Sequence, residues 1–146
     1  MSRQDKKSTV NRIIDANINR VKEGLRVCEE ITRFILNSRL LSLQLKTLRH
    51  EIDLIAKDLA AKKELLKERS VQDDVGRNIR ANELNRESIK DIFFANIQRV
   101  KESVRVLEEF SKLININSAL KFKRARYKVY AIEKKAAGRM SAISSH

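Results

Sequence analysis

Four arginines form two equivalent pairs in the sequence, and side chains of this kind can bind phosphate. Arg20 and Arg99 occupy matching positions in two similar segments, as Arg49 and Arg126 do further along the chain. The planar fork of a guanidinium group fits two phosphate oxygens at once. His50 follows Arg49 directly, but a lone histidine is most often structural. Spacing alone leaves open whether the four guanidinium groups converge on one site.

Two asparagines are expected inside a helical core. At about 100° of rotation per residue, Asn17 and Gly24 fall within the apolar stripe of the first segment, and Asn96 and Ser103 repeat this arrangement in the second. A buried amide needs hydrogen-bond partners. Two interpretations stay open: the amides and arginines hold a ligand, or the asparagines cross-link helices while the arginines pair with glutamates.

Charged side chains in the same segments have the spacing of helix-surface ion pairs. One set comprises Glu23, Arg26, Glu29, Glu30 and Arg33, and the other comprises Glu102, Arg105, Glu108, Glu109 and Lys112. Opposite charges three or four residues apart stabilise a helix by about 0.2–0.5 kcal/mol per pair. The pattern predicts a lattice of ion pairs that is solvated or contacts a neighbouring helix, and it does not indicate a catalytic dyad.

The chain contains an internal repeat. Residues 16–35 align without gaps on residues 95–114, with identical residues at twelve of twenty positions, and after a slip of two residues 45–50 align on 122–127. Each copy has the pattern of a helical hairpin, which alone would expose an apolar face. The two hairpins are therefore expected to pack about a pseudo-two-fold axis, with the paired asparagines and arginines approaching one another near it.

Composition and periodicity predict an all-α protein. The sequence has no proline and only three glycines, which are too few turn residues for a protein made of sheets. Helix-favouring residues dominate, and apolar residues recur at helical spacing in four segments. The predicted fold is a four-helix antiparallel bundle built from two duplicated helical hairpins, in a single domain of residues 1–146.

Capping residues and periodicity set the expected boundaries. The first hairpin spans about residues 8–67 and the second about 85–139, with a loop of residues 68–84 between them. In the first hairpin, one helix is expected to end at about residue 36 and the next to span about 39–67. In the second hairpin, one helix is expected to end at about residue 114 and the next to end at about 139. The predicted caps are Ser8 or Thr9, Asn85 or Ser88, and Asn117 or Ser118. The first seven residues are expected to be frayed and residues 140–146 to form a weakly ordered tail.

The segment 68–84 has no helical stripe and no counterpart inside either hairpin. Loops of this length within compact domains are usually functional or disordered. Asp74, Gly76 and Arg77 at its centre favour an ordered turn with the glycine at positive φ. We therefore predict an ordered functional loop.

The net charge of +13 raises the question of a nucleic-acid partner. Residues 1–74 carry 16 basic and 12 acidic side chains, whereas residues 75–146 carry 16 and 7, so the excess lies in the second half. Aromatic residues are few, and Tyr127 and Tyr130 do not form a stacking platform for single strands. A nucleic acid is therefore an unlikely partner.

Several motifs of phosphate and metal sites are absent from the sequence. No glycine-rich phosphate cradle occurs, and no pair of cysteines or histidines has metal-ligand spacing. Cys28 lies among apolar residues and is predicted to be a buried, reduced thiol. No apolar run approaches the roughly 20 residues that span a bilayer, and no signal peptide opens the chain. These features predict a cytoplasmic protein with no membrane segment.

Several separated motifs together resemble one protein family. They are residues 14–31, Leu48-Arg49-His50, Asp74-Val75-Gly76, and residues 95–99, 105–110 and 126–133. Over about residues 10–135, and in the same order, they resemble the helical domain often fused to the N-terminus of thiamine-phosphate synthase, an alternative hydroxymethylpyrimidine phosphate kinase family.

The resemblance implies phosphoryl transfer from ATP to hydroxymethylpyrimidine phosphate, which gives the diphosphate and usually requires Mg²⁺. The implied roles are phosphate binding by Arg20, Arg49, Arg99 and Arg126, pyrimidine orientation by Asn17 and Asn96, Mg²⁺ binding or proton acceptance by Asp74, and substrate contacts by Gly76 and an auxiliary His50.

Two other functions stay open. The domain could bind the pyrimidine phosphate or regulate thiamine-phosphate synthase without catalysis, or it could be a basic helical RNA-binding protein. No synthase domain follows in this sequence, so the domain is expected to act alone or to bind the synthase in trans.

Overall fold

The computed structural model describes residues 2–62, 86 and 88–144, and these residues form helices without any strand. The elements are α1 (Arg3–Glu30), the π-helix η1 (Ile31–Ile35), α2 (Arg39–Lys62), α4 (Ile89–Ser111) and α5 (Ile116–Ser144). The all-α class is confirmed. The predicted loop 68–84 and the last residues of the second predicted helix lie outside the described residues.

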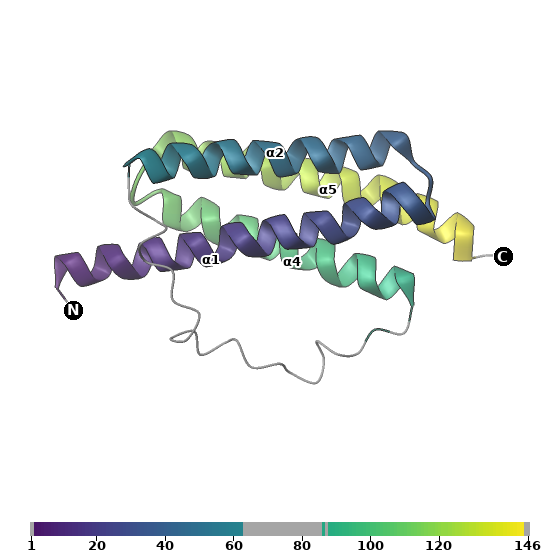
Figure 1. Cartoon of the computed structure of the whole chain (residues 1–146), viewed down its shortest axis with the longest axis horizontal. Helices are drawn as coiled ribbons and strands as arrows, with labels where there is room; N and C mark the ends of the chain where they lie inside the picture. The colour runs from purple at the N-terminus through teal and green to yellow at the C-terminus, as the bar shows by residue number, and fades with distance from the viewer. Residues whose placement is uncertain (1, 63–85, 87, 145–146) are drawn as a thin grey trace.

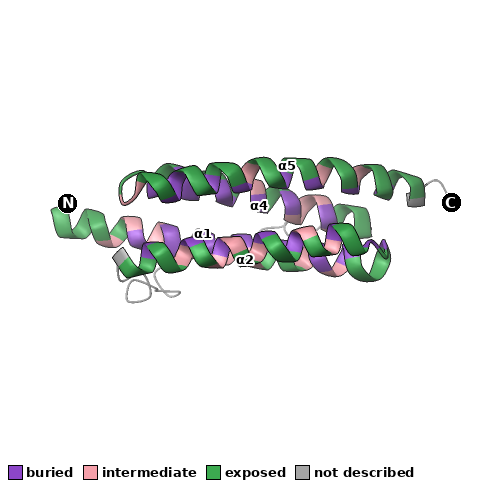
Figure 2. Ribbon diagram, turned by 90° about the horizontal axis from the view of Figure 1, so that it is seen from above, coloured by how far each residue is buried: buried purple, intermediate pink, exposed green. Residues whose placement is uncertain are grey.

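The four long helices form an antiparallel bundle (Figure 1). The hairpin α1–α2 and the hairpin α4–α5 make two layers, with α1 against α4 and α2 against α5 (Figure 2). Each helix therefore runs opposite to both of its neighbours, as in up-and-down bundles. This arrangement confirms the predicted bundle of two duplicated hairpins.

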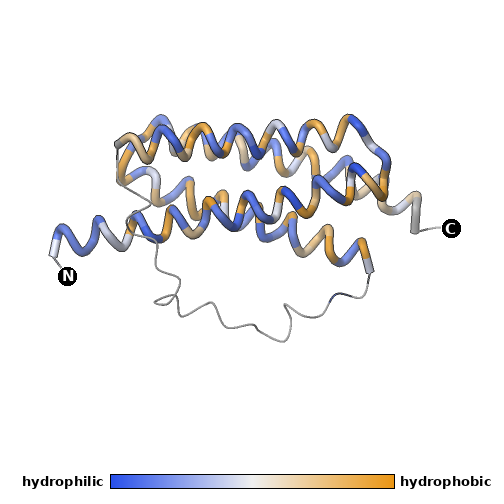
Figure 3. The backbone as a smooth tube through the Cα atoms, viewed as in Figure 1, coloured by the Kyte–Doolittle hydropathy of each residue, from blue (hydrophilic) through white to orange (hydrophobic). Residues whose placement is uncertain are grey.

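The core consists of the apolar stripes predicted from helical periodicity. Figure 3 shows apolar and polar residues alternating along each helix, and Figure 2 shows buried positions recurring along the inner faces of the helices. Buried members from the four helices include Val21, Leu45, Leu107 and Phe122, each with no more than a trace of exposure. The charged faces point outward, so burial of these stripes is what holds the two hairpins together.

The spacing of Leu25, Cys28 and Ile31 predicts that Ile35 continues the apolar stripe of the first helix, and this prediction is wrong. Its side chain is 43% exposed, whereas Leu36 is 5% exposed. The backbone N–H of Leu36 donates to the carbonyl of Ile31 at 3.0 Å, five residues back, which is the π-helical pattern. The wider turn moves the apolar stripe forward by one residue, so Leu36 takes the core position.

The N-terminus is helical earlier than predicted. α1 begins at Arg3, and Ser2 rather than Ser8 or Thr9 caps it. The Ser2 hydroxyl accepts from the Asp5 N–H at 3.0 Å, and the Asp5 carboxylate accepts from the Ser2 N–H at 3.2 Å. This reciprocal capping box satisfies two free donors of the first turn, which explains why polar residues form a helix here.

The other predicted caps are right in one case and displaced in the other. Ser88 caps α4, as one of the two alternatives predicted, and accepts from the Asp91 N–H at 3.1 Å. α5 begins at Ile116, and the side chain of Asn115 accepts from the Asn117 N–H at 3.0 Å. The cap therefore lies just before the residues that the sequence indicated.

The predicted C-terminal tail is helical as far as Ser144. Met140 is 4% exposed and joins the core. The Arg139 guanidinium donates to the carbonyl of Leu36 at 3.2 Å, which ties the end of α5 to the first hairpin's turn. The helix continues because this contact and the burial of Met140 stabilise it. Met140 follows Ala136 by four residues and so continues the buried stripe of α5, whereas the contact with Leu36 is not visible in the local sequence.

Gly24 lies at the tightest point between α1 and α4. A Cβ atom built on it would be 2.7 Å from Cγ2 of Val100 and 3.1 Å from the backbone oxygen of Asn96. Contacts this short require a neighbour to move, and one of the two is backbone. The helices therefore approach closely because this position lacks a side chain.

Cys28 is buried against α4, as the sequence predicted. Its thiol is 3.8 Å from the carbonyl of Phe93, to which it can donate weakly. Burial, reinforced by the charge of Glu133, raises the pKa of the thiol from its ordinary 9.0 to about 12. The thiol is therefore protonated and unreactive at neutral pH.

Replacing Cys28 is expected to alter stability at alkaline pH. The pKa of the thiol is 9.0 in the unfolded chain and about 12 in the folded one. Between these pH values ionisation stabilises the unfolded state, so the free energy of unfolding falls as the pH rises. Chemical denaturation of the wild type and Cys28→Ala at several pH values between these limits checks this. The wild type should lose more stability than the variant, and parallel losses would contradict the assignment.

None of the helices in the described residues is long and apolar enough to cross a membrane.

Candidate functional site

Two of the four predicted arginines form equivalent ion pairs between the helices of each hairpin. Nε of Arg49 is 3.1 Å from Oε2 of Glu29, and Nε of Arg126 is 3.0 Å from Oε1 of Glu108. Both carboxylates are almost fully buried, and both arginines are mostly covered. The predicted salt lattice is therefore confirmed in part: Glu29 and Glu108 join α1 to α2 and α4 to α5, whereas Arg33 pairs with no carboxylate among the described residues.

These two ion pairs lie toward opposite ends of the bundle. Glu29 is near the C-terminal end of α1 and Glu108 near that of α4, and the two helices are antiparallel (Figure 1). Gly24 of α1 lies opposite residues 96–100 of α4, which fixes the register of the two helices. At a rise of 1.5 Å per residue, the carboxylates of Glu29 and Glu108 are then roughly 20 Å apart along the bundle. The structure therefore does not bring Arg49 and Arg126 together.

Asn17 is buried as predicted, whereas Asn96 is only half-buried, and each side chain binds to its own helix. Nδ2 of Asn17 donates to the carbonyl of Ile13 and Nδ2 of Asn96 to the carbonyl of Ile92, both at 2.8 Å. Nη1 of Arg20 donates to Oδ1 of Asn17 at 3.4 Å. The amide donors therefore do not cross-link the helices, contrary to one of the two interpretations.

The remaining predicted residues are spread over the molecule. Arg99 is exposed on α4, and His50 is exposed on α2 beside Arg49. Asp74 and Gly76 lie outside the described residues, so the catalytic role of Asp74 and the substrate contact of Gly76 stay predictions.

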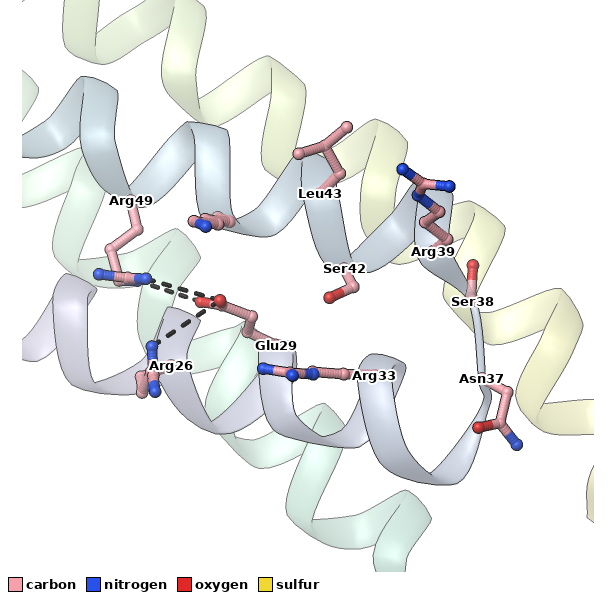
Figure 4. Close-up of a pocket in the computed structure, with 10 residues that line it drawn as sticks. Arg26, Glu29, Arg33, Asn37, Ser38, Arg39, Ser42, Leu43 and Arg49 are labelled. Atoms are coloured by element: carbon pink, nitrogen blue, oxygen red, sulfur yellow. Dashed lines mark hydrogen bonds and ion pairs between the residues drawn. The ribbon is translucent and has the colours of Figure 1, made fainter.

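A cavity of about 530 Å³ lies where the first hairpin turns, between the end of α1, η1 and the start of α2 (Figure 4). We call it the η1 pocket. Its charged lining consists of Arg26, Arg33, Arg39, Lys46, Arg49 and Glu29. Five cationic side chains thus surround one carboxylate, which makes the pocket a strongly positive concavity.

The turn beside the η1 pocket has an irregular backbone. Asn37 has φ 51°, the left-handed region that asparagine tolerates better than most residues. The Ser38 N–H donates to the carbonyl of Thr32 at 2.9 Å, and the Ser38 hydroxyl accepts from the Leu41 N–H at 3.2 Å. The first turn of α2 is thereby fixed with Ser38, Arg39 and Ser42 facing the cavity.

The single carboxylate neutralises only part of this charge. Glu29 pairs with Arg49, and its Oε1 is 3.8 Å from Nη1 of Arg26. Among the described residues, no carboxylate pairs with Arg33, Arg39 or Lys46. Three positive charges are therefore left for an anionic ligand.

The corresponding arginine of the second hairpin has different neighbours. Arg126 lies 5.1 Å from the ring centroid of Tyr127 and donates to the Tyr130 hydroxyl at 3.5 Å. Hydrogen bonds to Tyr130 and Glu108 raise the pKa of its guanidinium group. His50 and Asp53 occupy the equivalent places in the first hairpin, so the two copies have diverged around this arginine.

Comparison with known sequences identifies the family of this chain. The model of the ThiD2 family matches residues 12–135. The chain belongs to the ThiD2 family. It is also 45% identical over 125 residues to a thiamine-phosphate synthase of Nostoc punctiforme, a match that covers 85% of this chain and 34% of the relative.

Further thiamine-phosphate synthases match the same part of this ThiD2 family member. One from Nostoc sp. is 41% identical, covering 85% of this chain and 34% of the relative, and one from Synechocystis sp. is 39% identical, covering 86% and 36%. The chain thus spans about a third of the length of these relatives. No solved structure matches.

Three pocket residues escaped the sequence reasoning about the site. Arg33 has the spacing of a helix-surface ion pair. Arg39 and Lys46 belong to no motif, and neither has an acidic residue three or four positions away. The available signal was the two-residue slip between the repeats, which falls at the turn containing η1. An irregularity in an otherwise regular duplication marks where one copy has acquired a different structure.

Proposed function

We propose that this protein acts in thiamine biosynthesis and phosphorylates hydroxymethylpyrimidine phosphate to the diphosphate with ATP. Its membership of the ThiD2 family and its similarity to thiamine-phosphate synthases support the pathway. The observation that carries the activity is the η1 pocket, in which Arg49 lies among four further cations and one carboxylate.

The η1 pocket has the properties that phosphoryl transfer requires. The transferred group carries charge on its equatorial oxygens, and enzymes act mainly by positioning it and stabilising that charge. Fixed guanidinium groups do so effectively because they are oriented before the reaction begins. Glu29 holds Arg49 by two contacts, of 3.1 and 3.5 Å, and thereby fixes its guanidinium plane at the pocket wall (Figure 4).

The residues fit ATP phosphates better than they fit Mg²⁺. Arg33, Arg39 and Lys46, which pair with no carboxylate in the part of the chain that the structure describes, suit phosphate oxygens. In the described ranges no group of three acidic, histidine or cysteine side chains could hold a metal ion. We therefore assign no step to Mg²⁺, and Asp74 stays the proposed metal ligand or proton acceptor outside those ranges.

The other predicted site residues keep separate proposed roles. Asn17 and Asn96 would orient the pyrimidine ring. Arg20, Arg99 and Arg126 stay proposed phosphate ligands that do not line the η1 pocket. Of the four arginines that the sequence indicated as phosphate ligands, Arg49 is the one that lines the η1 pocket.

A coupled assay tests the proposed activity. Purified protein, ATP and hydroxymethylpyrimidine phosphate should yield ADP and the pyrimidine diphosphate in equal amounts, and omission of either substrate should abolish ADP formation. ADP release independent of the pyrimidine would contradict the proposal. Mass spectrometry of the pyrimidine product distinguishes transfer from simple hydrolysis.

A second function has one observation in its favour. Glu29 is the only carboxylate of the described residues that lines the η1 pocket, and arginines already engage it. A domain without a free base there would bind the pyrimidine phosphate and deliver it to thiamine-phosphate synthase. Saturable binding of the pyrimidine phosphate, without turnover but with stimulation of added synthase, would establish this function in place of the kinase.

A further inference from the structure

We propose that the η1 pocket is a polyphosphate subsite, which binds the di- or triphosphate group of a nucleotide through Arg33, Arg39 and Lys46. This assignment deepens the proposed function and rests on it, because it specifies which of the two substrates occupies the pocket. The pyrimidine monophosphate then binds beside this pocket, because transfer requires its phosphate next to the terminal phosphate of the nucleotide.

Charge is the first argument for a polyphosphate. After Glu29 has paired with Arg49 and approached Arg26, three cationic side chains in the pocket have no carboxylate partner among the described residues. A phosphate monoester carries about 1.5 to 2 negative charges at neutral pH. A di- or triphosphate carries more, and its oxygens extend over several positions. Three separated cations therefore match a polyphosphate chain better than a single phosphate.

Space is the second argument. The cavity of about 530 Å³ falls within the range of roughly 300–1,000 Å³ usual for small-molecule sites. Ser42 on the inner side of α2 and Ser38 at its start add hydroxyl groups to the wall. A bare phosphate ion would leave most of this volume to solvent, whereas a nucleotide polyphosphate with part of its ribose would occupy more of it.

The duplicated hairpin supplies an internal comparison. By the repeat alignment, Lys112 is the counterpart of Arg33 and Ile116 that of Arg39, while Lys123 corresponds to Lys46. Nζ of Lys112 is 3.0 Å from Oε1 of Glu109 and is thus neutralised. In the second copy, Ile116 therefore stands where the first has the cation Arg39, and Glu109 neutralises the counterpart of Arg33.

The connection between helices also differs between the copies. The slip of two residues falls between residues 35 and 45, directly after η1, so the first hairpin has two more residues in the stretch that contains the left-handed Asn37. π-helical turns are frequent at functional sites because they distort the regular helix. The longer turn, with Ser38 and Arg39 at the start of α2, forms one side of the cavity. The asymmetry of the repeat thus coincides with the proposed subsite.

Calorimetric titration with inorganic tripolyphosphate tests the proposal on the intact chain. Arg33→Ala, Arg39→Ala and Lys46→Ala are each expected to raise the dissociation constant roughly ten-fold, since each removes a charge-assisted contact. The matched controls Lys112→Ala and Lys123→Ala, in the second hairpin, should change it less than about two-fold because they alter only the long-range field. Orthophosphate should bind the wild type more weakly than tripolyphosphate.

Several results would overturn the subsite. They are an absence of tripolyphosphate binding, equal losses in both hairpins, unchanged binding in the three pocket variants, or orthophosphate binding as tightly as tripolyphosphate. All five substituted residues are exposed, and thermal unfolding followed by circular dichroism identifies any variant that is misfolded. A charge-conserving Arg39→Lys variant then replaces Arg39→Ala and should retain most of the affinity.

The same experiments separate this inference from the proposed function. Tripolyphosphate binding that depends on the pocket, in a protein that forms no pyrimidine diphosphate, would support the subsite and contradict the kinase. Normal pyrimidine diphosphate formation by the three pocket variants, with unchanged KM for ATP, would support the kinase and contradict the subsite.

Discussion

Replacement of Gly24 with leucine is expected to lower the free energy of unfolding by about 3 kcal/mol or more. The first added carbon would already lie 2.7 Å from Val100 and 3.1 Å from the backbone oxygen of Asn96. Val100 is β-branched and fully buried, so it has little freedom to turn aside. The two hairpins would have to separate at this point. Urea denaturation followed by circular dichroism measures the loss.

Gly138 provides the matched control for this substitution. It also lies within a helix, but a Cβ atom there would meet nothing within 4 Å. Gly138→Leu is therefore expected to be neutral or to stabilise by up to about 1 kcal/mol, because glycine is a poor helix former. Equal stabilities of the two leucine variants would show that α1 and α4 do not approach this closely.

Replacement of Arg49 with alanine is expected to lower the free energy of unfolding by about 2–4 kcal/mol, somewhat below the cost for a fully buried pair. It leaves the carboxylate of Glu29 buried with only Arg26, at 3.8 Å, as a partner. The η1 pocket also loses a cation, so tripolyphosphate affinity should fall as well. Denaturation and calorimetric titration of the same preparation measure both effects.

Arg126→Ala separates the structural from the ligand-binding part of this effect. The Arg126–Glu108 pair has nearly the same length and burial as the Arg49–Glu29 pair, so the loss of stability should be similar. The loss of tripolyphosphate affinity should be much smaller, because Arg126 does not line the η1 pocket. If both variants lose affinity equally, long-range charge rather than a local contact governs binding.

The fold was predictable because it depends on features that repeat. Leu45, Leu48 and Ile52 are buried as their spacing requires, and the equivalence of residues 16–35 and 95–114 implies equivalent packing. The errors lie at helix ends, where single interactions decide. The capping box at Ser2 and the contact of Arg139 with Leu36 each extend a helix beyond its predicted end.

The candidate site was predictable only in part, because residue types do not fix distances. Arg49 was singled out by its position in the repeat and lines the η1 pocket, but its separation from Arg126 follows from the antiparallel register of α1 and α4. The pocket depends on a π-helical turn, which no periodic pattern specifies in advance. Arg39 and Lys46 acquire importance only because that turn places them around one cavity.

The contact between Arg139 and the Leu36 carbonyl has a consequence for the order of folding. The ion pair of Arg49 with Glu29 joins residues only 20 apart in the chain, whereas this contact joins residues 103 apart. Contacts between near neighbours form early, and those between distant residues wait for the chain to close on itself. During synthesis from the N-terminus, the first hairpin can assemble well before residue 139 is made. Its turn would then receive its last support only after the second hairpin has been synthesised.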